Sequence, residues 1–484
     1  MGDVFAGGKI HFETLGCKLN QIESEALARA FSDSGFSVDL ESVTASVAEN
    51  FETILCIINT CTVTSKAEQK ARRLIRLLLE KFPQAAIVVT GCYAELEYAA
   101  IEAIDSRLAV IRGSRKDILA KLPALFLDFL RKESRNPQDI ARFVRALSAT
   151  KNENQSKIAP QFLLYTDTFQ THSRASIKIQ DGCNNACAYC RIHLARGKSV
   201  SLDVKSVLER VQQLEKAGQH EVVFTGVNLS QYRGELDGRK ADFAELFEIL
   251  LKNTSHIAFR ISSFYPEHIT ERLCEILKNP RVRPSFHLSI QSGSDKILRS
   301  MRRAYVADDV YRAVRLLRQA KENPFIACDI IAGFPDESEE DFAATKKMCE
   351  DLRFAWIHAF PFSPRPGTPA FSMTPKIPER IKGERVAWLM DCAKRGKIAY
   401  IEEMIGKEVD AIVENSRSDR LLLKNATRIH AVTENFLHAE IPVSVSDRVK
   451  PGDLIRIKMG KPLAEQIFAG GEQELSAELI SVLG

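Results

Sequence analysis

Three cysteines within one short stretch have a spacing that suits iron. Residues 181–190 read Asp-Gly-Cys-Asn-Asn-Ala-Cys-Ala-Tyr-Cys, which places thiols at Cys183, Cys187 and Cys190. Thiolates are good iron ligands, but a cubic 4Fe-4S cluster has four irons, so three cysteines leave one iron open. A ferredoxin, by contrast, supplies a ligand to every iron. The spacing therefore predicts a cluster whose open iron can hold a substrate.

The same thiols could instead hold structural zinc. Closely spaced cysteines are common zinc ligands, and His193, three residues after Cys190, could complete a Cys3His tetrahedron. Spacing alone leaves the iron and zinc interpretations open.

Length and composition are those of a soluble globular protein with several domains. At 484 residues the chain is too long for one ordinary core, and about three domains are expected. The net charge of +4 permits a nucleic-acid partner without requiring one. No apolar run approaches the ~18 residues of a membrane span, and the start lacks a signal-peptide pattern, so we expect a cytoplasmic protein. Eleven cysteines, an odd number, favour metal ligands and buried thiols over disulfides.

The amino-terminal part alternates strand-like and helix-like segments. Apolar runs at residues 9–15, 54–58 and 86–89 predict strands, and the segments between them carry apolar residues at helical spacing. Repeated βαβ units of this kind predict a doubly wound α/β domain.

A second set of cysteines follows these strands. Cys17, Cys61 and Cys92 each lie just past a predicted strand, at the edge where open α/β sheets gather their ligands. They can therefore converge in space although 44 and 31 residues separate them in the chain. The alternative is that each is an ordinary small buried residue, as we expect for Cys56 within its strand.

The central part repeats a strand followed by a helix. Six strand candidates span residues 175–180, 221–225, 257–262, 285–290, 325–331 and 355–360. Six repeats are fewer than the eight of a TIM barrel, so we expect a partial (βα)6 barrel, open on one side for a large substrate. Barrel enzymes work at the carboxyl ends of their strands, and the Cys183 loop follows the first strand.

Turn glycines and polar residues follow several of these strands and suit a bound cofactor. They are Thr225, Gly226 and Asn228 after the second strand, Gln291 and Ser292 after the fourth, and Gly333 after the fifth.

Other polar residues of the central part have two interpretations. Arg299, Arg302 and Arg303 could meet phosphate or form a solvated helix face. We expect His358 to pack inside the barrel. Four cysteines without useful spacing are predicted core residues: Cys274, Cys328, Cys349 and Cys392.

At the carboxyl end the apolar period changes to two. Residues 441–445 and 455–459 alternate strictly, and 409–413 do so less cleanly, which predicts a small antiparallel β-barrel of about 75 residues. Residues 405–484 hold ten Lys or Arg against twelve Asp or Glu, so RNA binding would need a local basic patch. The candidate patch is Arg417, Arg420, Lys424 and Arg428. A purely structural role is the alternative.

Several of these motifs resemble a known family. The segments Thr-Leu-Gly-Cys-Lys-Leu-Asn-Gln (14–21), Asn-Thr-Cys-Thr-Val-Thr (59–64) and Val-Thr-Gly-Cys-Tyr-Ala-Glu (89–95) are similar to three signatures of the methylthiotransferase amino-terminal domain. The Cys183 stretch resembles that of the radical S-adenosylmethionine (SAM) superfamily, and the carboxyl-terminal part resembles the RNA-binding TRAM domain. The chain is thereby identified as a member of the radical SAM methylthiotransferases.

The resemblance implies SAM and two 4Fe-4S clusters. Cys183, Cys187 and Cys190 would hold the cluster that cleaves SAM to a 5′-deoxyadenosyl radical. An auxiliary cluster, also with an open iron, would be held by Cys17, Cys61 and Cys92. The implied SAM contacts are Tyr189 beside the adenine, Thr225, Gly226 and Asn228 at the amino group, and Gln291, Ser292 and Gly333 near the adenine.

The resemblance also implies a substrate and partners. Residues 90–93, 177–183, 195–199 and 225–229 resemble the branch that acts on N6-threonylcarbamoyladenosine at tRNA position 37. Implied partners are the tRNA anticodon stem-loop, a sulfur source and a reducing electron donor such as flavodoxin or ferredoxin. Siblings acting on N6-isopentenyladenosine in tRNA or on a ribosomal-protein aspartate stay open, as does a non-catalytic, zinc-stabilised RNA-binding protein.

We expect four regions along the chain. They are the amino-terminal α/β domain (8–115), a helical and polar linker (116–168), the radical SAM partial barrel (169–403) and the TRAM-like barrel (404–484). One departure from the family pattern follows the last cluster cysteine, where two apolar residues and a proline are usual. This chain has Arg191, Ile192 and His193 there, which puts the geometry of the loop in question.

Overall fold

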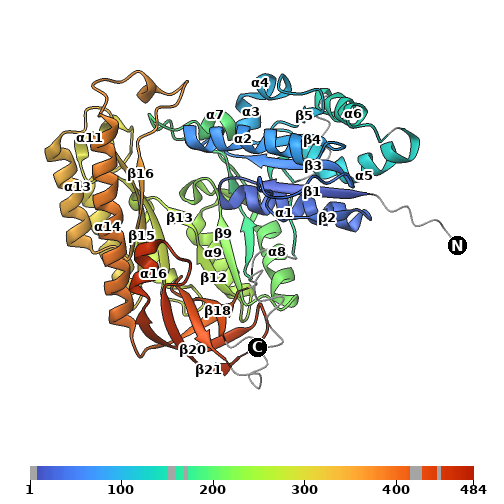
Figure 1. Ribbon diagram of the computed structural model, residues 1–484. Coiled ribbons are helices and arrows are strands. Elements are labelled where there is room, and N and C mark those ends of the chain that lie inside the picture. The colour runs from blue at the N-terminus through green and yellow to red at the C-terminus, as the bar shows by residue number, and fades with distance from the viewer. Residues whose placement is uncertain are drawn as a thin grey trace.

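Figure 1 shows a computed structural model of the protein, which describes residues 8–133, 135–150, 158–167, 173–414, 428–443 and 449–483. Three bodies are visible: an amino-terminal sheet with helices, a central set of strands and helices, and a small carboxyl-terminal barrel. In the described part of the chain, no helix is long and apolar enough to cross a membrane.

The amino-terminal body is a parallel sheet with the strand order β2-β1-β3-β4-β5. Its strands are β1 (Lys9–Thr14), β2 (Ser37–Asp39), β3 (Thr53–Thr60), β4 (Ala86–Gly91) and β5 (Leu108–Val110). This is a doubly wound order, with its topological switch between β1 and β3. The three predicted strands are present, while the edge strands β2 and β5 are too short to show an apolar run.

Helices cover both faces of this sheet, each over its own apolar core. On one face lie α1 (Lys18–Asp33), α5 (Lys116–Lys132) and α6 (Pro137–Ala149). On the other lie α2 (Ser65–Lys81) and α4 (Tyr98–Glu102), with α3 (Cys92–Leu96) directly after β4. Phe126 of α5 and Val144 of α6 are fully buried against the sheet, so much of residues 116–149 packs on the amino-terminal body. The predicted domain boundaries themselves stay predictions.

The central body contains the six predicted strands, all parallel, in chain order. They are β6 (Ala175–Lys178), β9 (Glu221–Thr225), β12 (Ala258–Ile261) continued by β13 (Ser263–Phe264), β14 (Ser285–Gln291), β15 (Phe325–Ala332) and β16 (Trp356–Pro361). The third strand is interrupted at Ser262, so β12 pairs with β9 while β13 pairs with β14. Among the described residues the outer strands β6 and β16 form no pair with each other, which confirms an open, partial barrel.

Helices follow these strands, and most of them cover the outside of the barrel, whereas the short α7 lies beside the amino-terminal body. They are α7 (Ile192–Arg196), α8 (Val204–Lys216), α9 (Phe243–Asn253), α10 (Glu271–Leu277), α11 (Asp295–Ser300), α12 (Ala307–Ala320), α13 (Glu339–Leu352) and α14 (Glu379–Met404). Short strand pairs flank the first two repeats: β7 (Gln180–Asp181) with β8 (Val200–Ser201), and β10 (Gly234–Leu236) with β11 (Arg239–Ala241). Four cysteines were predicted to be core residues. Cys274, Cys328 and Cys349 are buried, which confirms the prediction for these three, whereas Cys392 is half-buried.

The carboxyl-terminal body is a closed barrel in the order β17-β18-β19-β21-β20. Its elements are β17 (Glu408–Val413), β18 (Arg428–Thr433), β19 (His438–Pro442), β20 (Leu454–Pro462), α16 (Ala464–Ala469) and β21 (Leu475–Val482). The predicted barrel is confirmed, with one difference: β19 and β21 are parallel, so the barrel is mixed and not wholly antiparallel. β20 and α16 both lie between β19 and β21 in the chain, and this long crossover allows a parallel pair that a tight hairpin excludes.

This barrel packs at the amino ends of β15 and β16, where Phe325 and Ala355 share its apolar core. The Cys183 loop and α7 lie at the other end of the central strands, beside the amino-terminal body. Of the predicted basic patch, only Arg428 lies among the described residues. It is exposed and pairs with Glu440 of the neighbouring strand.

Candidate functional site

The loop of Cys183, Cys187 and Cys190 starts directly after β7. Backbone contact fixes its beginning, because the Cys183 N–H donates to the carbonyl of Gly197 at 3.0 Å. Gly182 has φ +71°, and a Cβ there would lie 2.1 Å from the Lys198 carbonyl oxygen. Only glycine fits this close approach of two backbone segments. The loop is therefore held to the segment that follows α7.

Each of the three sulfurs in this loop has an N–H donor near it. Backbone N–H groups of Asn185 and Ile192 donate to the sulfurs of Cys183 and Cys190, both at 3.4 Å. Cys187 receives its donor from Arg303, whose Nη1 lies 3.7 Å from the sulfur. Hydrogen-bond donors of this kind stabilise anionic sulfur, and metal binding requires the thiolate. The donor set thus fits a cluster bound through these three cysteines.

Arg303 also belongs to this site, and its buried environment could not be predicted from the sequence. Arg299 and Arg302 are exposed, as a solvated helix face requires, but Arg303 is only 9% exposed. Its guanidinium carbon lies 4.5 Å from the ring centre of Tyr265 and 5.9 Å from that of Tyr189. The Nε atom is buried without an acceptor among the described residues. An unused buried donor beside a cluster cysteine fits an anionic group of a bound cofactor, such as a carboxylate.

Asn228 is a predicted SAM contact from outside the cysteine loop that lies beside Cys183. Its Nδ2 is 4.0 Å from the Cys183 sulfur, and its backbone N–H donates to Gln180 Oε1 at 2.8 Å. Gly226, between Asn228 and Thr225 at the end of β9, approaches Gln180 so closely that a Cβ would lie 2.8 Å from Oε1. The end of β9 and the cysteine loop are therefore in contact.

The other predicted SAM contacts are distributed around the same end of the barrel. Tyr189 packs against a small apolar cluster that contains Phe334, the residue after Gly333. Gln291 ends β14 with φ +72°, while the Ser292 hydroxyl is fully buried and lies 3.3 Å from that of Thr345. The Ser292 hydroxyl thus serves the loop itself. A role in SAM binding stays a prediction for all seven residues.

The second cysteine set lies at the carboxyl edge of the amino-terminal sheet. Cys17 precedes α1, Cys61 follows β3, and Cys92 begins α3. A Cβ on Gly16, which has φ +103°, would lie 2.8 Å from the Cys61 sulfur, so the Cys17 and Cys61 loops are in contact. Burial raises the pKa of Cys61 to about 11, and the nearby Cys92 and Cys17 add to the rise. The three strand ends therefore bring Cys17, Cys61 and Cys92 near one another, while their binding of a cluster stays a prediction.

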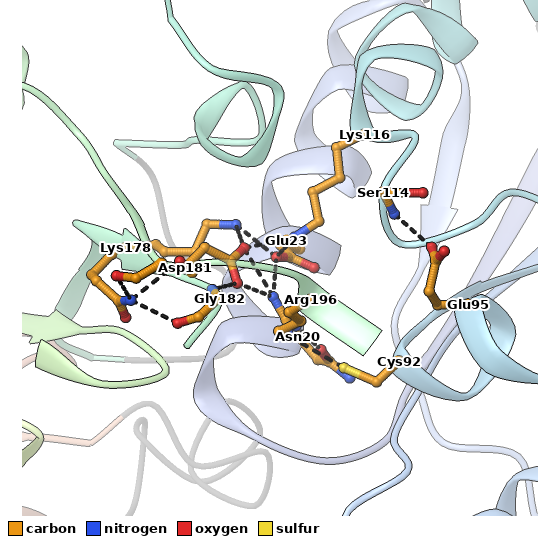
Figure 2. Close-up of polar contacts among 12 residues, drawn as sticks. Asn20, Glu23, Cys92, Glu95, Ser114, Lys116, Lys178, Asp181, Gly182 and Arg196 are labelled. Carbon is orange, nitrogen blue, oxygen red and sulfur yellow. Dashed lines mark hydrogen bonds and ion pairs between the residues drawn. The ribbon is translucent and has the colours of Figure 1, made fainter. Parts of the chain in front are cut away.

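A buried ion cluster links this second set to the first (Figure 2). Arg196, the last residue of α7, donates from Nε to the Cys92 sulfur at 3.2 Å and from Nη1 to Asp181 at 3.0 Å. Burial raises the pKa of the Cys92 thiol, and the Arg196 charge opposes that rise. Asp181 lies two residues before Cys183. One arginine therefore connects the loop of one cysteine set to a sulfur of the other.

Arg191, which departs from the family pattern, forms a second link between the two bodies. It donates to Glu68 of α2 and to Glu97, each at 3.1 Å. Glu68 also accepts from Thr62, the residue after Cys61, and from Arg365, which is almost fully buried. The unusual arginine thus holds the end of the Cys190 loop beside the Cys61 loop.

The zinc interpretation required four ligands around one ion, with Zn–S distances of about 2.3 Å. Within the described residues, no three His, Cys, Asp or Glu side chains are grouped closely enough to hold a single metal ion. A 4Fe-4S cluster differs in that each cysteine binds its own iron, so the sulfurs are spread around a larger body.

Comparison with known proteins agrees with this geometry. The pattern described as Radical SAM superfamily matches residues 177–349, and the pattern described as Uncharacterized protein family UPF0004 matches residues 9–113. The chain is 45% identical to the threonylcarbamoyladenosine tRNA methylthiotransferase MtaB of Treponema pallidum, over 93% of this chain and 98% of that one. This chain belongs to the methylthiotransferase family of radical SAM proteins.

Other members of the family and one solved structure extend the comparison. A tRNA-2-methylthio-N(6)-dimethylallyladenosine synthase of Herminiimonas arsenicoxydans is 32% identical over 88% of this chain and 90% of its own. The radical S-adenosylmethionine methyltransferase TsrM of Kitasatospora setae shares the fold, with a TM-score of 0.52 and 15% identity over 75% of this chain and 76% of that one.

The ion cluster between the two bodies could not be predicted from the sequence. In the sequence, Lys116 is a single basic residue at the start of the predicted linker, and Glu23 is a single acidic residue in a helical segment. Neither belongs to a motif. The available signal was position alone: Glu23 lies six residues after Cys17, and Arg196 lies six residues after Cys190.

Proposed function

We propose that the protein inserts a methylthio group at C2 of N6-threonylcarbamoyladenosine at position 37 of tRNA. The observation that carries this proposal is the pair of three-cysteine sets, which come from two different bodies and are joined through Arg196. A sulfur-inserting enzyme needs two such sites, one for the radical and one for the sulfur. The 45% identity to a threonylcarbamoyladenosine tRNA methylthiotransferase, over nearly the whole chain, supports this substrate.

Cys183, Cys187 and Cys190 would hold the radical-generating 4Fe-4S cluster, and Cys17, Cys61 and Cys92 the auxiliary one. When bound, the first cluster and SAM supply a 5′-deoxyadenosyl radical, a reagent that the unactivated adenine C2–H bond requires. The chain positions these groups: the donors on the three loop sulfurs stabilise the thiolates, and the unused Nε of Arg303 faces a position for the SAM carboxylate. Asn228, at the end of β9, lies beside Cys183 for the SAM amino group.

The tRNA must place one base between the two cysteine sets. Proteins that read RNA by sequence bind unstacked bases of loops, and position 37 lies in the anticodon loop. The carboxyl-terminal barrel lies at the opposite end of the central strands, so we assign it to a part of the tRNA away from the modified base. The remaining partners are a reducing electron donor, such as flavodoxin or ferredoxin, and a sulfur source. The enzyme would act in the cytoplasm, on tRNA.

The test is reconstitution of the purified protein under anaerobic conditions, followed by reaction with SAM, a reductant and tRNA that carries N6-threonylcarbamoyladenosine. Nucleosides from digested tRNA are then separated by chromatography and identified by mass spectrometry. We expect 2-methylthio-N6-threonylcarbamoyladenosine and 5′-deoxyadenosine. Parallel reactions with tRNA carrying N6-isopentenyladenosine and with ribosomal protein test the sibling activities. Modification of either of these in place of the first substrate would refute the proposal.

A further inference from the structure

The ion cluster between the two bodies contains more positive than negative side chains. Five side chains form it, none more than 6% exposed: Glu23, Lys116, Lys178, Asp181 and Arg196. Lys178 lies 2.7 Å from Glu23 and 3.1 Å from Asp181, and Lys116 contacts the same two carboxylates. Three cations therefore face two anions. A buried charge without compensation is strongly destabilising, so a further negative group is expected nearby.

The Cys92 sulfur is in the right place to be that group. Figure 2 shows Arg196 between the carboxylates on one side and Cys92 on the other. The two lysines can balance Glu23 and Asp181, which leaves the Arg196 charge for the sulfur, 3.2 Å from its Nε. The charge count is balanced when Cys92 is a thiolate, as it is when bound to iron.

Arg196 is also fixed relative to the two other cysteines of this set, through Asn20. Its Nη2 donates to Asn20 Oδ1 at 2.8 Å. Asn20 Nδ2 in turn donates to the carbonyl of Leu15 at 2.8 Å and to that of Thr60 at 3.1 Å. These carbonyls lie in the segments that carry Cys17 and Cys61. The guanidinium is thus connected to all three cysteine segments of the auxiliary site.

We propose that Arg196, which belongs to the radical SAM body, is a positioning residue that sets the reduction potential of the auxiliary cluster. The inference rests on the proposed function, because it requires a cluster at Cys17, Cys61 and Cys92. A reduced cluster is more negative than an oxidised one, so a cation and an N–H donor at a ligand sulfur favour reduction. Arg196 therefore raises the potential of the auxiliary cluster.

An arginine suits this role better than a lysine. Its planar guanidinium directs separate N–H groups to a sulfur, a carboxylate and an amide oxygen, each at a hydrogen-bonding distance. A lysine ammonium is a compact point charge on a flexible chain and cannot hold these three acceptors in one plane. Arg196→Lys is therefore expected to retain charge but lose the sulfur hydrogen bond.

The test uses full-length protein in which Cys183, Cys187 and Cys190 are all replaced by alanine, so that only the auxiliary cluster is present. This parent and its Arg196→Gln derivative are reconstituted, iron is counted, and a redox titration is followed by electron paramagnetic resonance. Removal of Arg196 leaves two lysines with two carboxylates, so the ion cluster stays neutral and the fold is expected to persist. We expect about four irons in both proteins and a more negative potential in the Arg196→Gln protein.

Arg191→Gln in the same parent is the matched control. Arg191 lies five residues before Arg196 and also joins the two bodies, but it pairs with Glu68 and Glu97 and not with a sulfur. We expect it to leave the potential unchanged. An equal shift in both variants, or no shift in Arg196→Gln, overturns the inference while the auxiliary cluster stands.

Two further outcomes are also decisive. If Arg196→Gln loses iron, Arg196→Lys is titrated instead, and a lowered potential there supports the proposal while an unchanged one overturns it. A parent that holds no iron refutes the two-cluster function itself, and this inference with it.

Discussion

The two cysteine sets are assembled in different ways. Cys183, Cys187 and Cys190 lie within eight residues of one another, and two of the four N–H donors to their sulfurs are nearby backbone groups, those of Asn185 and Ile192. Cys17, Cys61 and Cys92 come from three strand ends, and the Cys92 sulfur accepts from an arginine of another body. The first set is therefore a nearly local structure, whereas the second depends on how two bodies fit together. The predictions below test this difference.

Replacing one cysteine from each set should separate the two halves of the reaction. Cys183→Ala removes a ligand for the cluster that cleaves SAM, so formation of 5′-deoxyadenosine should fall at least ~100-fold. Cys61→Ala should spare SAM cleavage and stop methylthio transfer. Chromatography of 5′-deoxyadenosine and of tRNA nucleosides measures both steps. Methylthiolation by the Cys61→Ala protein would show that the two cysteine sets do not have separate roles.

Asp181→Asn should destabilise the ion cluster that joins the two bodies. The Asp181 carboxylate contacts Lys116, Lys178 and Arg196, and its loss leaves three buried cations with Glu23 alone. Breaking a buried ion pair in this way is destabilising by about 3–5 kcal/mol. Urea unfolding of the metal-free protein at neutral pH measures the change. Asp128→Asn, which removes an exposed partner of Arg131 on α5, is the control and should change stability by less than ~1 kcal/mol.

Arg303→Gln should affect only the site of Cys183, Cys187 and Cys190. Arg303 lies 3.7 Å from the Cys187 sulfur, and its replacement removes a buried charge and a donor beside a cluster ligand. Substitution of such an outer partner typically reduces activity ~10-fold or more. SAM cleavage measures this loss, while the iron content of the auxiliary site should stay the same. Arg299→Gln, on the exposed face of α11, should leave both unchanged.

The smallest effect is expected for Glu68→Gln. This change weakens the link from Arg191 and Arg365 to Thr62 but keeps a side chain of the same shape. Because the link aligns the two loops and contacts no sulfur, methylthio transfer should fall a few-fold, by about 1 kcal/mol, while SAM cleavage is unchanged. The ratio of methylthiolated nucleoside to 5′-deoxyadenosine measures this uncoupling. An unaltered ratio would show that Arg196 alone holds the alignment.

The comparison also explains what sequence could and could not predict. Strands β3, β4, β9 and β15 were evident because each is a buried apolar run, and the Cys183 spacing is local. Cys61 and Cys92 could be proposed as ligands because each follows such a strand, and Cys17 because it follows β1. Lys116 and Glu23 are 93 residues apart, and Arg196 and Cys92 are 104 apart, so no local pattern indicates their pairing. The parallel pair of β19 and β21 was missed for the same reason.

The position of Arg196 in the chain has a consequence for biosynthesis. A growing chain folds from its amino terminus, and the last strand of the sheet that carries Cys17, Cys61 and Cys92 ends at Val110, 86 residues before Arg196. Until then the auxiliary site lacks the cation that balances its sulfur. If Cys17, Cys61 and Cys92 hold the proposed auxiliary cluster, we expect its insertion to be favoured after the central body has folded. The order of synthesis thus determines when the complete site becomes available to iron.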